Sequence, residues 1–170
     1  ALLKLLEEPN KNINFILINN NKKILPTLLS RCINFKISLS NKESLDIANK
    51  LLNGKINSYL NKDLINYYMT PGNIFRLVFF GTNNNLDLVD YSLETLLKII
   101  IDNNYYKKDN FIKFMIFDLI KFYFNKINIS FSSEIYSKYE FFLKKINETK
   151  KFNLDEESLF IEFKDEILNG

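Results

Sequence analysis

The chain contains no histidine and no tryptophan, and among its 170 residues it has four glycines and a single cysteine, Cys32. Without histidine it lacks the usual general base of hydrolases and the commonest zinc ligand. A lone cysteine excludes an internal disulfide and a cysteine-cluster metal site. The most apolar stretch, residues 111–124, is interrupted by Lys113, Asp118 and Lys121, so no run is long enough to span a bilayer. These absences remove most hydrolase mechanisms, and we expect a cytoplasmic protein.

The composition is that of an ordinary globular chain, with 46% hydrophobic residues, 25% charged residues and a formal net charge of +3. That is enough for one sizeable core or for two to three small ones. The slight excess of basic residues does not imply nucleic-acid binding by itself. Because the sequence starts inside a helical pattern without an initiating Met, we expect that an N-terminal part is missing.

An arginine stands between two apolar stretches in residues 24–32, which read Ile-Leu-Pro-Thr-Leu-Leu-Ser-Arg-Cys. The pattern predicts a short helical turn with Arg31 at its tip, pointing outward. Arginine is suited to bidentate recognition of phosphate or carboxylate, and its charge is permanent. The alternative is an ordinary surface arginine. The apolar residues expected to anchor the turn on both sides are Leu28, Leu29, Cys32, Ile33 and Phe35.

Two short apolar runs around this turn predict strands of a sheet. Residues 13–18 are almost continuously apolar, which is typical of a strand buried on both faces of a parallel sheet. Residues 33–39 alternate imperfectly and predict a final strand. Asn19, Asn20 and Asn21 follow the first run, at the end of a strand where ligands gather in open α/β sheets. They could orient water or a phosphate, or they could simply form a polar loop.

The remainder of the chain predicts helices. Ser40 and Glu43 form a capping box that starts a helix through Leu52, with Gly54 ending it. Residues 60–68 are expected to be helical. Thr70 and Pro71 open another helix, whose buried stripe is Ile74, Leu77 and Val78, and a break is expected over residues 81–85.

From Leu86 onward the pattern is helical throughout, with expected helices over residues 93–101, 110–125, 136–146 and 154–168. On 110–125 the polar residues fall within an arc of roughly 140°, so this helix must be covered on most sides, either by its own domain or by neighbouring subunits. Asn153 and Glu156 predict a second capping box, and Gly170 a C-terminal cap.

Three motifs occur in a fixed order: Ala-Leu-Leu-Lys-Leu-Leu-Glu-Glu-Pro at residues 1–9, Asn-Phe-Ile-Leu-Ile-Asn-Asn at 14–20, and Leu-Pro-Thr-Leu-Leu-Ser-Arg-Cys at 25–32. Over about the first forty residues this sequence resembles the second half of the AAA+ module of bacterial DNA polymerase III clamp-loader subunits. The resemblance implies a mostly α fold. It would consist of the C-terminal remnant of an α/β AAA+ core (1–39), a helical lid (40–82) and a helical collar (86–170) through which subunits assemble into a ring.

Two kinds of family member share the Ser-Arg-Cys motif, the ATP-hydrolysing motor subunit (tau/gamma) and the delta-prime subunit. Motor subunits carry a sensor-2 arginine at the start of a lid helix, where this sequence has Gly72. Arg76 lies one turn later. This departure favours a delta-prime-type subunit, a component of the DNA polymerase III holoenzyme that is itself catalytically incomplete. The alternatives are a motor subunit, or a helical oligomerisation module in which Arg31 has no role.

The resemblance also implies residue roles and partners. Arg31 would be an arginine finger acting in trans, on a turn set by Pro26, Thr27, Ser30 and Cys32. Either Asn19 or Asn20 would be the sensor-1 residue. The fragment would bind no cofactor of its own, the ATP and Mg²⁺ belonging to the neighbouring subunit. Its partners would be the motor and delta subunits in a hetero-oligomeric ring, and the sliding clamp and primed DNA through that complex, with no membrane involved.

Overall fold

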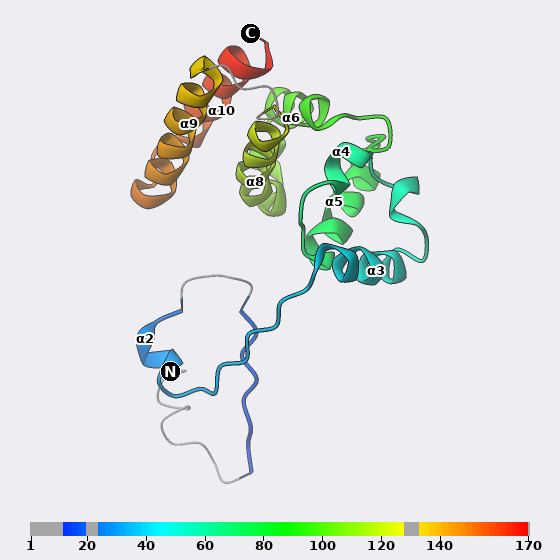
Figure 1. Ribbon diagram of the computed structural model, residues 1–170, viewed down its shortest axis with the longest axis vertical. Coiled ribbons are helices and arrows are strands. Elements are labelled where there is room, and N and C mark those ends of the chain that lie inside the picture. Colours follow the sequence, from blue (N-terminus) through cyan, green and yellow to red (C-terminus); the bar gives the residue numbers. More distant parts are fainter. Residues whose placement is uncertain (1–11, 20–23, 128–132, 170) are drawn as a thin grey trace. The chain divides into compact units, whose positions relative to one another are not determined.

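A computed structural model describes residues 12–19, 24–127 and 133–169 of the chain (Figure 1). The chain divides into two compact units, Ala1–Ser38 and Leu39–Gly170. The predicted helix over residues 1–8, Asn20, Asn21 and the predicted cap Gly170 lie outside the described residues.

In the first unit, the described residues contain one short helix, α2 (Pro26–Leu29). The strands predicted over residues 13–18 and 33–39 are wrong for the described chain, because neither segment is assigned to a strand. A strand requires a neighbour for its backbone N–H and C=O groups, and no backbone hydrogen bond joins residues 12–19 to 33–38. The fold is therefore confirmed as helical, and the α/β remnant is not seen in the part of the chain described.

The second unit is helical. Its elements are α3 (Asn41–Leu51), the 3-10 turn η1 (Ile56–Ser58), α4 (Lys62–Ile65), α5 (Pro71–Asn83), α6 (Leu93–Asp102), α7 (Tyr105–Lys108), α8 (Asn110–Ile127), α9 (Ser133–Phe152), α10 (Glu156–Phe163) and the π-helical turn η3 (Lys164–Leu168). Both segments expected to be lid and collar fall within this one unit.

Helix starts follow the capping signals of the sequence. The side chain of Ser40 accepts from the N–H of Glu43, and the Glu43 carboxylate accepts from the N–H of Ser40 at 2.8 Å, which completes the predicted capping box. Hydrogen bonds from the Ser40 backbone and hydroxyl lower the pKa of Glu43. Thr70 caps α5 through the N–H of Asn73, and Pro71 takes the first helical position, as predicted.

Several predicted boundaries are wrong. Helix α5 continues through Gly81 to Asn83, and no helix is assigned between it and Leu93, so the chain is not helical throughout from Leu86. Within the predicted helix over residues 60–68, only Lys62–Ile65 is helical.

The predicted capping box at Asn153 is also wrong. The cap of α10 is Asp155, whose carboxylate accepts from the N–H groups of Glu157 and Ser158. Asn153 instead has a φ of 53° just after α9, a left-handed conformation that asparagine tolerates better than most residues.

Helix α8 is covered on most sides by its own unit. It contacts α6, α7 and α9, and its buried residues are Ile112, Met115, Ile116, Phe117, Leu119, Ile120, Tyr123 and Phe124. Phe163 of α10 lies 5.7 Å from Phe124 and 5.6 Å from Phe142 between ring centroids, and all three rings are buried. Such edge-on and tilted aromatic contacts add to the stabilisation that area burial gives.

Two glycines of α5 give a matched test of packing. A Cβ atom at Gly81 would lie 2.6 Å from Cδ1 of the buried Leu88, whereas a Cβ at Gly72 would meet nothing within 4 Å. We expect Gly81→Ala to destabilise the unit, because overpacking costs about 1–3 kcal/mol and exceeds a helix-propensity gain of about 1 kcal/mol. Gly72→Ala should be neutral or slightly stabilising. Urea unfolding of both variants measures the difference, and an equal gain for both would contradict this packing.

Candidate functional site

Arg31 lies directly after the single helical turn α2. The turn begins at Leu25, whose carbonyl accepts from the N–H groups of Leu28 at 2.9 Å and of Leu29 at 3.2 Å. It closes with the N–H of Ser30 donating to the carbonyl of Pro26 at 3.0 Å. Pro26 fits the first helical position, because its fixed φ suits the helix and it has no N–H to satisfy. The sequence therefore builds this corner locally, as predicted.

The Arg31 side chain is exposed and lies against its own turn. Its Nη1 donates to the carbonyl of Thr27 at 2.8 Å and to the hydroxyl of Ser30 at 3.4 Å. The Ser30 hydroxyl in turn donates to the same Thr27 carbonyl at 3.1 Å. An arginine near a helix C-terminus commonly satisfies carbonyls in this way. Thr27, Ser30 and Arg31 are thus brought together by the turn.

The apolar residues around Arg31 are less buried than the sequence predicts. Leu28 and Cys32 are half-buried, and Cys32 is a free thiol. Ile33 is 84% exposed and Phe35 is 79% exposed. The predicted anchoring of the turn on both sides is therefore not seen in the described residues, since no described layer covers these side chains.

The two candidate sensor-1 residues are separated by the limit of the described chain. Asn19 is exposed at the end of the extended segment 12–19, whereas Asn20 lies outside the described residues. Both Asn19 and Asn20 therefore remain candidates for the sensor-1 role.

The predicted sensor-2 position carries no side chain that could reach a phosphate. Gly72 is exposed in the first turn of α5. Arg76, one turn later, has its guanidinium carbon 5.9 Å from the ring centroid of Phe111 on α8. This cation–π contact engages Arg76 within the second unit. This contact was not predictable from the sequence, because a pairing of residues this far apart has no local pattern.

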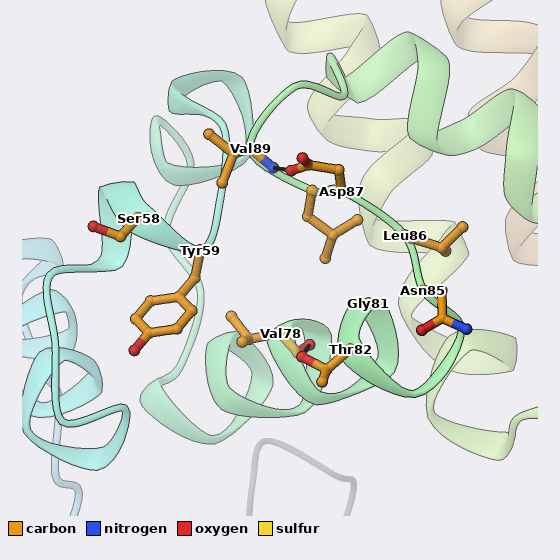
Figure 2. Close-up of a pocket in the computed structure, with 10 residues that line it drawn as sticks. Ser58, Tyr59, Val78, Gly81, Thr82, Asn85, Leu86, Asp87 and Val89 are labelled. Carbon is orange, nitrogen blue, oxygen red and sulfur yellow. Dashed lines mark hydrogen bonds between the residues drawn. The ribbon is translucent and has the colours of Figure 1, made fainter.

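A surface pocket of about 350 Å³ lies between η1, α5 and the segment that follows α5 (Figure 2). Tyr59, Val78 and Leu88 give it apolar walls. Asp87 is the one charged residue among the described residues that line it, and its carboxylate accepts from the N–H of Val89 at 3.1 Å. None of the residues predicted for the site lines this pocket.

The described residues contain neither a metal-binding cluster nor a membrane-spanning helix. No group of three or more His, Cys, Asp or Glu residues there could hold a metal ion. No helix in that part of the chain is long and apolar enough to cross a membrane.

Comparison with known proteins gives one match. A family model described as "DNA polymerase III, delta subunit" matches residues 1–41. No curated protein and no solved structure matches the chain. The matched residues contain the three ordered motifs, so the predicted resemblance to polymerase III clamp-loader subunits is confirmed over this stretch.

Proposed function

We propose that this chain is a delta-prime-type subunit of the DNA polymerase III clamp loader, and that it supplies Arg31 in trans to ATP bound by a neighbouring motor subunit. The match over residues 1–41 supports the clamp-loader assignment. The observation that carries the finger role is the placement of an exposed arginine, within Ser-Arg-Cys, on a turn of locally fixed geometry. The guanidinium would stabilise the charge on the phosphoryl group being transferred.

The energies are compatible with this role. To reach a triphosphate, Arg31 must leave the Thr27 carbonyl, and a hydrogen bond to a charged group contributes about 1.5–3 kcal/mol. An arginine finger is worth about 10³–10⁵ in rate, or roughly 4–7 kcal/mol of barrier. The gain exceeds the cost of giving up this one hydrogen bond.

Two residues of helix α5, in the proposed lid, support the proposal that this subunit does not hydrolyse ATP itself. Gly72 offers no side chain to a γ-phosphate, and Arg76 contacts Phe111. In this proposal the chain binds no nucleotide of its own, and the ATP and Mg²⁺ belong to the motor subunit beside it. A delta subunit, the sliding clamp and primed DNA complete the assembly, and helices α6–α10 form the collar.

Reconstitution tests the proposal. The full-length protein is mixed with motor and delta subunits from the same organism, and assembly is followed by size-exclusion chromatography. We expect a stable complex that loads clamps only when this chain is present. Failure to assemble would contradict the proposal. ATP hydrolysis by the purified chain alone would instead favour a motor subunit.

A further inference from the structure

Two side-chain contacts join residues 40–82 to residues 86–170: one is a stack of aromatic rings and the other is an ion pair. The rings of Tyr67 and Phe122 are stacked, with centroids 5.0 Å apart and an interplanar angle of 6°. Beside them, the ammonium group of Lys126 forms an ion pair with the carboxylate of Asp63. Phe122 and Lys126 are four residues apart on α8 and therefore share one face of that helix. We call these four residues the clasp.

The start of helix α4 is also fixed to the segment that follows α5. Asn61 caps α4, its side-chain oxygen accepting from the N–H of Asp63 at 3.0 Å. The backbone N–H of Asn61 donates to the carbonyl of Leu88, and its side-chain amide donates to the carbonyl of Val89, both at 2.7 Å. Asn61 thus links the start of α4, which carries Asp63 of the clasp, to the segment after α5.

Helix α5 makes further contacts with the later helices. Phe80 lies edge-on to Tyr105 of α7 with ring centroids 5.1 Å apart. The guanidinium of Arg76 lies over the ring of Phe111. In the segment before those helices, Leu88 packs close to Gly81, where a Cβ atom would lie 2.6 Å from the Leu88 Cδ1 atom. These contacts involve residues outside the clasp. Residues 40–82 and 86–170 are therefore joined by more than one set of contacts.

Of the two clasp contacts, the ring stack contributes more. The side chains of Asp63 and Lys126 are 27% and 39% exposed, and an ion pair so open to solvent is worth little by itself. Stacked rings add to the effect of area burial. Burial also raises the pKa of the Tyr67 hydroxyl.

From these contacts we infer that the clasp, together with the contacts of Asn61 and helix α5, makes helices α3–α5 and α6–α10 open and unfold as one body, so that residues 40–82 do not swing independently of the later helices. The inference goes beyond the proposed function, because it concerns the second unit alone and does not depend on Arg31 or on any nucleotide.

Native-state hydrogen exchange of the full chain tests this inference. In the unaltered protein, the slowest amides of α5 and α8 should report the same free energy of opening, as expected for one cooperative unit. Tyr67→Ala should speed exchange in α5 by about tenfold relative to α8, because it removes the stack. Tyr67→Phe, which keeps the ring, should leave the two helices coupled.

Tyr68 is the matched control, because it is the adjacent tyrosine and is 47% exposed. Tyr68→Ala should leave the ratio of α5 to α8 exchange rates unchanged. Three results would overturn the inference: independent opening of α5 in the unaltered protein, equal acceleration of both helices by Tyr67→Ala, or the same effect from Tyr68→Ala.

Discussion

Replacing Arg31 with alanine should lower the DNA-stimulated ATPase rate of a reconstituted clamp loader by about 10³-fold or more, the effect of removing an arginine finger. The chain should still fold, because Arg31 is exposed and its hydrogen bonds to Thr27 and Ser30 lie within its own short turn. Steady-state ATP turnover with primed DNA and clamp measures the rate. Size-exclusion chromatography establishes that the variant still enters the complex.

Arg31→Lys separates charge from geometry. Lysine keeps the positive charge but lacks the planar fork that binds two phosphate oxygens at once. We therefore expect most of the loss to remain in this variant. Lys36→Ala, which removes an exposed cation from the same unit, is the matched control and should leave turnover unchanged. A full ATPase rate in the Arg31→Ala complex would remove the finger role, even if the chain proved to be a clamp-loader subunit.

Helix starts were predictable because capping is a local interaction. The Ser40–Glu43 box and the Thr70–Pro71 start each involve residues within one turn, and the structure contains both. The buried stripe of Ile74, Leu77 and Val78 follows from helical periodicity for the same reason. The α2 turn that carries Arg31 likewise depends on residues only a few positions away.

Features that depend on distant residues were not predictable. Residues 13–18 have the composition of a strand, but a strand forms only beside another one, and the described residues provide none. Gly81 suggested a break, yet it is a helical residue that allows Leu88 to approach. The pairing of Tyr67 with Phe122 joins positions with no sequence pattern between them. In each case tertiary packing decided the outcome.

The aromatic core of the second unit gives the largest expected effect on stability. Phe163 is fully buried, and its ring lies against those of Tyr123, Phe124 and Phe142. Phe163→Ala removes these contacts and leaves a cavity, a change that typically costs about 3–5 kcal/mol. That is a large share of the roughly 5–15 kcal/mol by which globular domains are stable. Urea unfolding followed by circular dichroism should show a much lower midpoint, or a chain already partly unfolded.

Ile161 provides the control on the same helix, because it is 47% exposed and lies two residues before Phe163. Ile161→Ala should change the free energy of unfolding by no more than about 0.5 kcal/mol. If Phe163→Ala proved as mild as this, the ring could not lie at the centre of the α8–α9–α10 packing. A large loss confined to Phe163 would instead show that the aromatic cluster holds these three helices together, because the two variants differ chiefly in burial.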